Sequence, residues 1–498
     1  MTPLEARAWL NLAVFDTLGP LIRAPVVEAL MPVGILRDYQ LDLLRRAAHA
    51  MALGYRRILL VLPTGGGKTV LASAMMASAL AQRDRSQFIV HRKELIDQTS
   101  ETFTEQGLLH GFVASGRPMA GEQDLITLAG VQTLVRRLDV LLPPRFAIVD
   151  ESHHATAASW ANVLDYYGDR DCFVLGLTAT PERLDGKGLD EHFDIMIVGP
   201  STADLIEAEW LSPFDYYAPG VPDLSGIHTT AGDFNRGEID ELMNEPKLVG
   251  DIVSHYQRLA AGEQGIVFAA SRAHSKSIVE AFLREGVEAA HVDGTMSTEA
   301  RRDIVMAHRR GDLAVMSNVD LFGEGFDVPA VSYVGLARPT KSLALHLQQA
   351  GRGLRISPGK ERAIICDHAG NAFRHGLPDE PREWSLQGRK GRAASSNPNS
   401  DATPVHQCDT CFRVTPSSVK VCPGCDTPFP VKKQTDPKQE QGELAKLERV
   451  ERAKRRKIEE RACRTYEDFL QLAITRGYSK PQGWARIRMS MKARGGRR

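Results

Sequence analysis

A run of three glycines followed by a lysine and a threonine is the first feature of the sequence that could do chemistry. It ends the loop formed by residues 63–69, between the apolar strand-like stretch 56–62 and the helical run 70–80. Glycines at such a turn let backbone N–H groups converge on phosphate oxygens at the positive end of the helix. A plain glycine turn is the alternative. The expected nucleotide contacts are the loop residues Thr64, Gly65, Gly66 and Gly67, then Lys68 on the β- and γ-phosphates and Thr69 on Mg²⁺.

Two adjacent carboxylates follow another apolar stretch, residues 146–149. Asp150 and Glu151 open a tetrapeptide that ends at His153. Because α/β sheets bind their ligands just beyond the carboxyl ends of their strands, both carboxylates are expected near the phosphate loop. We expect Asp150 to hold Mg²⁺ and Glu151 to orient or deprotonate an attacking water. An ordinary acidic turn after a strand is the alternative.

Four of the seven cysteines have the spacing of two metal-binding knuckles. Two residues separate Cys408 from Cys411 and Cys422 from Cys425, and ten residues separate the pairs. Four thiolates of this kind bind Zn²⁺ tetrahedrally and leave no position open for catalysis. We therefore expect a structural zinc ion in a segment too short to fold around a core of its own. A redox pair, or an iron centre with the same thiolates, is the alternative.

These residues need a scaffold, and the sequence predicts two α/β units in tandem. Short β-rich apolar runs alternate with helical stretches in both, which is the pattern of a parallel sheet flanked by helices. The candidate strands are 56–62, 87–90, 146–149 and 173–177 in the first unit, and 265–269, 289–292, 313–317, 332–336 and 363–366 in the second. The phosphate loop and the acidic pair both follow strands of the first unit.

Further motifs stand in the order known from one family. They occupy residues 36–40, 178–180, 317–329 and 348–355. With the phosphate loop and the acidic pair, they make residues 36–376 resemble the superfamily 2 helicases of the DExH/DEAD-box type. The resemblance is greatest to the helicase subunits of restriction enzymes and to related phage or prophage helicases. It implies two RecA-like domains that bind ATP and Mg²⁺ in their shared cleft and hydrolyse ATP to ADP and phosphate.

The resemblance also assigns roles to residues on both sides of that cleft. The implied adenine contacts are Arg37 and Gln40, the implied coupling residues are His153, Thr178, Thr180 and Gln348, the implied nucleotide contacts of the second domain are Gly325 and Asp327, and the implied arginine fingers are Arg352 and Arg355. Leu354 replaces the glycine of the commoner form of the last motif, which leaves the division of labour between the arginines open. A basic, solvated helix end is the alternative for either arginine.

A track for nucleic acid is implied on the side of the motifs that faces away from ATP. Its candidate contacts are Arg92, Thr133, Ser271 and Thr295. Cations and hydroxyls grip phosphates without reading bases, although surface or helix-cap positions also explain such residues. DNA is favoured over RNA, because residues 91–92 and the acidic tetrapeptide depart from the pattern of RNA-remodelling helicases. The lack of a long insertion in either motor domain favours translocation over strand separation.

The function predicted from these motifs is that of a DNA-dependent ATPase, a helicase or translocase. An RNA helicase and an ATP-gated recruitment protein that binds nucleic acid are the alternatives. A recruitment protein does not need Glu151 together with Arg352 and Arg355, whereas turnover needs both the water-orienting acid and the finger.

Composition and charge predict the surroundings of this motor. The apolar runs are far shorter than the roughly 20 residues of a membrane span, and the few cysteines argue against a disulfide scaffold, so we expect a cytoplasmic protein that binds no membrane. Residues 431–498 hold 20 lysines and arginines and 9 acidic residues. The rest of the chain holds 42 lysines and arginines and 53 acidic residues. This asymmetry predicts that the cysteine module and the basic tail form one separate unit for attachment to nucleic acid or to a protein partner.

The sequence thus predicts seven segments along the chain. Charged residues interrupt the apolar character of the first of them, which therefore does not resemble a signal peptide. The segments are an N-terminal helical extension (1–34), the ATP-binding RecA-like domain (35–200), a connector with small secondary elements (201–245), the second RecA-like domain (246–376), a linker (377–404), the zinc module (405–430) and a basic helical tail (431–498).

Overall fold

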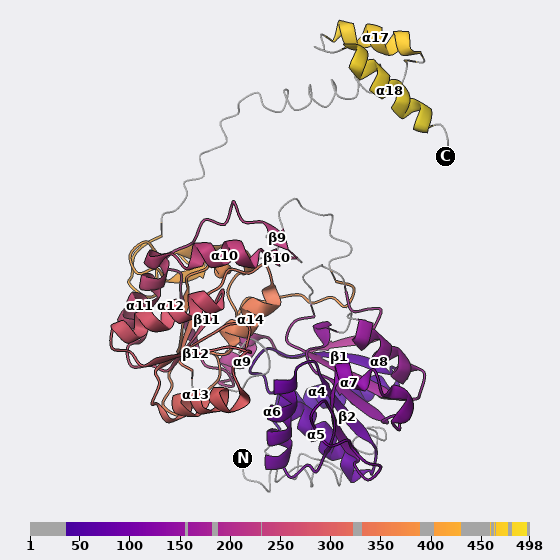
Figure 1. The fold of residues 1–498 in the computed structure, drawn as a ribbon, viewed down its shortest axis with the longest axis vertical. Helices are drawn as coiled ribbons and strands as arrows, with labels where there is room; N and C mark the ends of the chain where they lie inside the picture. The colour runs from indigo at the N-terminus through magenta and orange to yellow at the C-terminus, as the bar shows by residue number, and fades with distance from the viewer. Residues whose placement is uncertain are drawn as a thin grey trace. The chain divides into compact units, whose positions relative to one another are not determined.

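The chain divides into two compact units, Met1–Phe429 and Pro430–Arg498 (Figure 1). The structure is a computed structural model, and it describes residues 36–154, 158–181, 188–230, 232–321, 331–388, 403–429, 459, 463, 465–476 and 481–495. The expected extension 1–34 lies outside the described residues. No helix within the described ranges is both long and apolar enough to cross a membrane.

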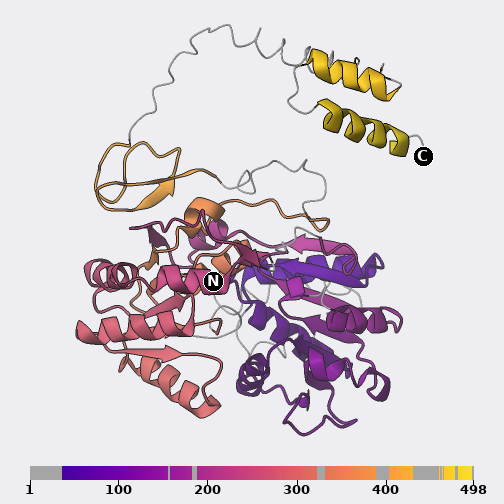
Figure 2. The ribbon, with the colours of Figure 1, turned by 45° about the horizontal axis from the view of Figure 1, so that its top comes forward.

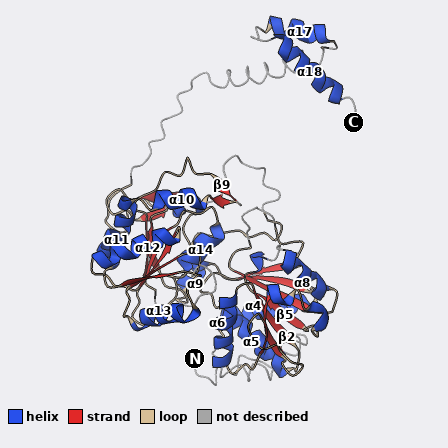
Figure 3. Cartoon of the chain, in the orientation of Figure 1, coloured by secondary structure: helices blue, strands red, loops and turns tan. Residues whose placement is uncertain are grey.

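Seven parallel strands form the first sheet, in the order β3-β4-β2-β5-β6-β1-β7. Most of its strands are continuous apolar runs because helices cover both faces, α4, α5 and α6 on one and α7 and α8 on the other (Figure 3). The bounds are β1 (Arg57–Val61), β2 (Ser86–Val90), β3 (Gly111–Val113), β4 (Ile126–Gly130), β5 (Phe146–Val149), β6 (Phe173–Thr178), β7 (Ile195–Val198), α4 (Asp38–Ala52), α5 (Lys68–Ala81), α6 (Lys93–Glu105), α7 (Val131–Leu134) and α8 (Ala158–Gly168).

Six parallel strands form the second sheet, in the order β12-β13-β11-β14-β15-β8. Helices α11 and α12 pack on one face, and α9, α13, α14 and α15 pack on the other. The bounds are β11 (Gly265–Ala269), β12 (Ala289–Val292), β13 (Val315–Asn318), β14 (Tyr333–Ala337), β15 (Ala363–Asp367), α9 (Thr202–Glu207), α11 (Pro246–Ala260), α12 (Arg272–Arg284), α13 (Thr298–Arg310), α14 (Leu343–Gly351) and α15 (Asn371–His375).

The stretch 201–245, expected as a connector, contributes the edge strand β8 (Phe214–Tyr217) to the second sheet. This strand runs parallel to β15, with Phe214 opposite Ala363. The remaining elements of the stretch are α9, α10 (Arg236–Met243) and the short antiparallel pair β9 (Thr229–Thr230) and β10 (Asp233–Phe234). The second motor domain therefore begins before residue 246.

The first part of the expected linker, 377–388, runs back to the first domain. Leu386 is buried in the same core cluster as Leu189, and the Leu189 N–H donates to the Leu386 carbonyl oxygen at 2.7 Å. A Cβ on Gly188 would lie 2.3 Å from that oxygen, so the close approach requires glycine. The linker residues 389–402 lie outside the described residues.

Two helices, α17 (Tyr466–Thr475) and α18 (Pro481–Gly495), form the described part of the smaller unit. A capping box between Thr465 and Asp468 starts α17. The helices pack around Phe469 and Ala485, and the Phe469 ring meets the Trp484 ring edge-on at 6.2 Å. The tail therefore contains a helical pair with a small core of its own.

Candidate active site and metal centre

The phosphate loop depends on glycine at two positions. Gly65 and Gly67 have φ of 84° and 81°, a region that L side chains rarely adopt. Gly67 also caps α5, so Lys68 begins the helix directly after the loop. The loop therefore presents the N-terminus of α5 beyond the end of β1, which is the geometry of an anion site.

The side chains of Lys68 and Thr69 lie at the helix end of this loop. Lys68 Nζ donates to the Leu62 carbonyl oxygen at 3.3 Å, next to the end of β1. Thr69 is exposed in the first turn of α5. A phosphate in the loop would thus have an ammonium and a hydroxyl beside it.

Residues 36–40 hold the loop from one side. The Tyr39 hydroxyl donates to the Gly66 carbonyl oxygen at 2.8 Å, and Gln40 Nε2 donates to the Gly67 carbonyl oxygen at 3.3 Å. A Cβ on Gly67 would lie 2.4 Å from that amide nitrogen, which is a second reason for glycine there. The structure thus places Gln40 at the phosphate loop and adds Tyr39, which the sequence does not single out.

Two residues of the stretch 201–245 lie beside the phosphate loop and the residues that hold it. The Arg37 guanidinium carbon lies 4.3 Å from the centre of a Trp210 ring, and Arg37 Nη1 donates to the Tyr39 hydroxyl at 3.0 Å. Leu211 approaches within 2.9 Å of the position of a Cβ on Gly65. Sequence reasoning misses Trp210 and Leu211 because neither lies in a periodic pattern or a known motif.

Glu151 has a rare backbone conformation directly beyond β5. Its φ is 48° and its side chain is buried; such strain gathers at functional sites. The Glu151 N–H donates to Asp150 Oδ1 at 3.0 Å, and Glu151 Oε2 lies 3.4 Å from His153 Nδ1. The two predicted carboxylates are therefore held beside each other at the end of the strand.

His153 joins this acidic turn to residues 178–180. Its Nδ1 lies 3.3 Å from Thr178 Oγ1. That hydroxyl donates to the Thr180 carbonyl oxygen at 2.9 Å and accepts from the Thr180 N–H at 3.1 Å. Three of the four predicted coupling residues thus lie together, while Gln348 is buried in α14 of the second domain.

The arginine motif lies against the phosphate loop. A Cβ on Gly351, the last residue of α14, would lie 2.6 Å from Thr64 Cβ. Arg352 follows and is buried, and Arg355 Cγ lies 3.7 Å from the position of a Cβ on Gly65. Burial lowers the pKa of the Arg355 guanidinium to about 10, so this side chain remains a cation at neutral pH.

A cavity lies at this junction of the two motor domains. Residues from the phosphate loop, from 178–180, from the arginine motif and from the segment 377–388 line it. Among them are Thr64, Ala179, Gly351, Leu354 and Trp384. The two other predicted nucleotide contacts, Gly325 and Asp327, lie outside the described residues.

Lys360 supports the backbone of the arginine motif. Its Nζ donates to the carbonyl oxygens of Val331 and Arg355, both at 2.8 Å, and to that of Gly353. Burial lowers the pKa of the Lys360 ammonium to about 8. Sequence reasoning misses this residue because a lysine five positions beyond the motif carries no pattern signal.

The predicted nucleic-acid contacts of the first domain are Arg92 and Thr133. Arg92 Nη1 donates to the Asp320 carbonyl oxygen at 2.8 Å, so this side chain reaches the second domain. Thr133 is half-buried in the short helix α7. Arg92 therefore lies at the junction of the two motor domains.

Ser271 and Thr295 are the predicted contacts of the second domain. Ser271 caps α12, where its hydroxyl accepts from the His274 N–H at 3.0 Å. The Thr295 hydroxyl donates to Asp293 Oδ1 at 2.6 Å. Both hydroxyls thus bond within the protein, and the helix-cap alternative describes the local role of Ser271.

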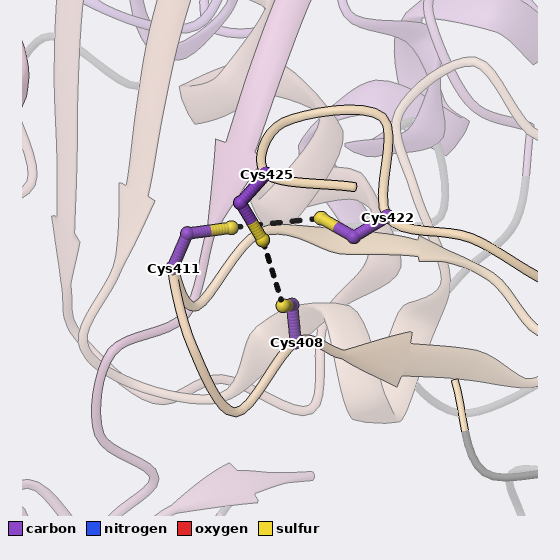
Figure 4. Close-up of side chains that lie close together, drawn as sticks. All are labelled: Cys408, Cys411, Cys422 and Cys425. Carbon is purple, nitrogen blue, oxygen red and sulfur yellow. Dashed lines mark hydrogen bonds between the residues drawn. The ribbon is translucent and has the colours of Figure 1, made fainter. Parts of the chain in front are cut away.

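The four cysteines lie together, which confirms the expectation from their spacing. Their sulfur atoms all lie within 4.8 Å of one another. Cys408 Sγ lies 3.5 Å from Cys425 Sγ, and the same distance separates the sulfurs of Cys411 and Cys422 (Figure 4). Four sulfurs about 2.3 Å from one tetrahedral Zn²⁺ would be about 3.8 Å apart, so the donor set fits such an ion.

Each cysteine pair is built on the same backbone turn. The Phe412 N–H donates to the Cys408 carbonyl oxygen at 2.8 Å, and the Asp426 N–H donates to the Cys422 carbonyl oxygen at 2.9 Å. Phe412 and Asp426 also share a left-handed backbone, with φ of 64° and 55°. The two matched turns direct all four sulfurs to one centre, as Figure 4 shows.

This module packs on the second motor domain, which corrects the expectation that it forms one separate unit with the tail. Its strands are β16 (Val405–Gln407) and β17 (Val414–Pro416), and the module lies beside the second motor domain in Figure 2. Val414 is buried in the core cluster of the second sheet. The Ala218 N–H, just beyond β8, donates to the Phe412 carbonyl oxygen at 3.0 Å. Arg413 forms an ion pair with Asp215 of β8. Only the tail belongs to the other compact unit.

Two family models match the chain in the order of its two sheets. The family described as "Type III restriction enzyme, res subunit" matches residues 34–183. The helicase conserved C-terminal domain matches residues 246–357. The first match covers the phosphate loop and the acidic turn, and the second ends within the arginine motif.

Relatives with similar sequences include phage, fungal and bacterial proteins. A 51.5 kDa protein of a Lactococcus phage is 34% identical over 78% of this chain and 81% of its own. IRC3 of Saccharomyces cerevisiae, named as an ATP-dependent helicase, is 29% identical over 70% of this chain and 53% of its own. The type I restriction enzyme EcoKI endonuclease subunit of Escherichia coli is 26% identical over 65% of this chain and 33% of its own.

Two solved structures share the fold. A fragment of an HsdR subunit of a type I restriction enzyme from Vibrio vulnificus has a TM-score of 0.55 and 20% identity, and the match covers 72% of this chain and 70% of the fragment. Saccharomyces cerevisiae Dbp5 has a TM-score of 0.52 and 16% identity, over 72% of this chain and 91% of Dbp5. These likenesses confirm the predicted fold of two tandem RecA-like domains.

Proposed function

The chain belongs to the superfamily 2 helicases, in the branch of restriction-enzyme helicase subunits and related phage proteins, and we propose that it is a motor that translocates on DNA. Its helicase domains and helicase relatives make it a nucleic-acid-dependent enzyme that hydrolyses ATP. The proposal adds the polymer, the movement along it and the roles of individual residues.

The observation that carries this proposal is the contact between Gly351 and Thr64, which joins the arginine motif to the phosphate loop. Lys68 binds the β- and γ-phosphates, and Glu151 orients the attacking water. Asp150 and Thr69 hold the Mg²⁺ ion, which neutralises charge on the phosphates. Residues of both domains thus serve one reaction.

Arg352 and Arg355 stabilise the charge that spreads over the transferred phosphoryl group. Both belong to the second domain, so they act only while the two domains are closed. An arginine in this role contributes about 10³ to 10⁵ in rate. The contact of His153 with Thr178 links the acidic turn to this closure.

DNA as the polymer is supported by relatives that are named as restriction enzyme subunits. Arg92, Thr133, Ser271 and Thr295 contact the sugar-phosphate backbone in this proposal, since a motor that passes any sequence must not read bases. The Dbp5 structure, described as bound to RNA, shares the fold alone and does not favour RNA.

The proposal includes a structural Zn²⁺ ion in the cysteine module. Cys408, Cys411, Cys422 and Cys425 supply four thiolates and leave no site open to substrate. The ion therefore supports the fold of the module and takes no part in hydrolysis.

ATP turnover by the full chain, measured without polymer and with single-stranded DNA, duplex DNA or RNA, tests the choice of polymer. We expect DNA to raise turnover well above the level reached with RNA. Displacement of a third strand from a DNA triplex then reports translocation. Equal stimulation by RNA would assign the motor to RNA, and no stimulation by any polymer would overturn the proposal.

Substitutions test the assigned chemistry. Glu151→Gln should lower turnover by about 10² to 10³ and leave ATP binding intact, whereas Lys68→Ala should weaken both. Arg352→Ala and Arg355→Ala should lower DNA-stimulated turnover far more than ATP affinity. Glu191→Gln, at an exposed carboxylate of the first domain, is the control. If the arginine variants lost ATP affinity and turnover equally, the two arginines would bind ATP in the ground state and would not act as fingers.

A further inference from the structure

A continuous chain of hydrogen bonds joins two predicted functional segments of the second motor domain. It runs through Ser317, Ser275, His291, Asp293 and Thr295. Ser275 Oγ lies 2.7 Å from Ser317 Oγ and 2.7 Å from His291 Nδ1. His291 Nε2 lies 2.9 Å from Asp293 Oδ2, and Thr295 Oγ1 lies 2.6 Å from Asp293 Oδ1. Side chains from α12, β12, β13 and the turn after β12 therefore form one path.

The path has an exposed end and a buried end. Thr295 is exposed, whereas Ser275 and Ser317 are fully buried. Thr295 is a proposed contact with the nucleic-acid backbone, and Ser317 begins the segment 317–329 that is expected to touch the nucleotide. Buried polar networks whose members are all bonded are rigid, because breaking one bond leaves a desolvated polar group behind.

The number of available protons determines what happens when Thr295 binds a phosphate. Asp293 Oδ1 accepts both from the Thr295 N–H, at 2.7 Å, and from the Thr295 hydroxyl, at 2.6 Å. A hydroxyl carries one proton, and a phosphate oxygen at neutral pH mainly accepts. The Thr295 hydroxyl can therefore donate to a phosphate only by releasing Asp293.

The charge of Asp293 transmits this exchange to His291. Partial burial raises the pKa of Asp293, but the hydrogen bonds from Thr295 and His291 outweigh burial and hold the pKa well below its usual range. Asp293 is therefore an anion, and after losing the Thr295 hydroxyl it depends more on the His291 Nε2–H. A stronger bond at Nε2 shifts the imidazole ring, and with it the contact between Nδ1 and the Ser275 hydroxyl, which donates to Ser317.

We propose that His291 is a positioning residue that couples phosphate binding at Thr295 to the placement of Ser317. Through this path, bound nucleic acid sets the position of Ser317 in β13 and so stimulates hydrolysis. The inference rests on the proposed function, since it requires that a polymer stimulate the ATPase. His291 itself contacts neither polymer nor ATP.

Two substitutions cut the path on different sides of the ring. His291→Asn keeps an amide near the position of Nδ1, so it preserves the bond to Ser275 and loses the bond to Asp293. His291→Gln reaches Asp293 and loses Ser275. We expect both to lower the ratio of DNA-stimulated to basal turnover about three- to thirtyfold, while the DNA concentration for half-maximal stimulation stays at the wild-type value.

Ser297→Ala is the matched control, because Ser297 caps α13 next to the path without belonging to it. Its stimulation ratio should stay at the wild-type value. Adding Thr295→Ala to His291→Asn should lower the ratio no further, because both changes cut the same path. Losses that multiply in the double variant would show that the two residues act separately and would overturn the coupling.

The outcomes separate this inference from the proposed function. If wild-type turnover responds to no polymer, the proposed function fails. If DNA stimulates the wild type and both His291 variants equally, only the role of His291 is overturned. A raised half-maximal DNA concentration at an unchanged ratio, or a loss of melting temperature that matches the loss of activity, would reduce His291 to structural support and also overturn the coupling.

Discussion

The cysteine module, residues 403–429, and the helix pair α17–α18 both follow the motor in the sequence, and both are too small for a large core. The module places Val414 in the core of the second sheet and pairs Arg413 with Asp215. The helix pair instead packs around its own Phe469 and Ala485 and belongs to the other compact unit. Two appendages of similar size, which follow each other in the sequence, are therefore stabilised in different ways.

This difference assigns the two appendages to different tasks. Strand β8 starts near the phosphate loop, where Leu211 approaches Gly65, and ends at the module, where Ala218 bonds to Phe412. One segment of the second motor domain, residues 211–218, thus links the neighbourhood of the phosphate loop to the module. The excess of basic residues in 431–498 lies in the same unit as the helix pair, so of the two appendages only the tail is expected to attach to DNA.

Loss of one of the proposed zinc ligands is the largest effect that this comparison predicts. Cys422→Ser removes one of four thiolates, and the module would then lose the proposed Zn²⁺ and its hold on β8. We expect the free energy of unfolding of the larger unit to fall by more than about 4 kcal/mol, the range in which lost metal sites lie. Thermal melting followed by circular dichroism, with zinc counted by mass spectrometry, measures it.

Cys463→Ser is the control for this experiment, since Cys463 is buried in the core of the smaller unit. It should leave the melting of the larger unit and the zinc content unchanged. Equal melting of the larger unit in wild type and Cys422→Ser would show that the module does not support the motor.

The ion pairs of Asp215 predict a smaller effect. Arg413 of the module and Arg362 of the motor both bond to this carboxylate, but Arg413 is mostly buried and the Arg362 side chain is 52% exposed. Arg413→Ala should lower the free energy of unfolding by about 1.5 to 3 kcal/mol. Arg362→Ala should cost less than about 1 kcal/mol, because exposed ion pairs contribute little.

Urea unfolding of both variants measures the difference. A larger loss for Arg362→Ala would mean that Asp215 serves the motor alone and that the module rests on its apolar contacts. In that case the module would differ from the helix pair only in the apolar contacts of Val414 with the second sheet.

Truncation after Phe429 tests the other half of the comparison. The remaining chain keeps the module and should melt at the wild-type temperature, whereas loss of the basic tail should raise the DNA concentration for half-maximal stimulation. Its salt dependence should also become shallower, because fewer phosphate contacts release counterions. A chain cut after Gly388 should instead be unstable, because it lacks the module. Unchanged DNA and salt dependence after truncation at Phe429 would assign the tail to a protein partner.

The fold could be predicted where sequence signals are local. The strands that end at the phosphate loop and at Asp150 are short apolar runs, and their predicted bounds differ little from those of β1 and β5. Strand β8 could not be predicted in the same way, because it is only four residues long and stands between Pro213 and Pro219 in an irregular stretch. Its place in the sheet is fixed by pairing with β15, about 150 residues away in the chain, as with Phe214 and Ala363.

The candidate site shows the same division. Lys68, Glu151 and the four cysteines belong to motifs of a few consecutive residues, and each motif forms a single backbone turn. The sequence alone therefore identifies them. Trp210 and Lys360 act through partners brought close by tertiary packing, and no local pattern marks them. The docking of the module on the second domain could not be predicted for the same reason, because Arg413 bonds to Asp215, which lies 198 positions away in the chain.

The smallest predicted effect distinguishes the two knuckles of the module. Asp426 and Phe412 occupy the same position after their cysteine pairs and share a left-handed backbone. Glycine adopts this conformation without the cost that a Cβ imposes, although it also loses more entropy on folding. Asp426 is exposed, so Asp426→Gly should change the stability of the module only through the backbone and raise it by about 0.5 kcal/mol.

Phe412→Gly makes the same backbone change at the knuckle that touches the motor. The Phe412 ring lies 6.3 Å from the His255 ring and 5.5 Å from the Arg258 guanidinium carbon, both of α11. Removing the ring loses these contacts, so this variant should be destabilised by about 1 to 3 kcal/mol despite the relieved backbone. Urea unfolding measures the change in the free energy of unfolding for both variants. Changes of opposite sign would show that the Phe412 knuckle binds the motor, while the Asp426 knuckle only holds the proposed ion. Stabilisation by both substitutions would mean that the Phe412 ring contributes nothing to docking, and the module would then be held to the second domain by β17 and Arg413 alone.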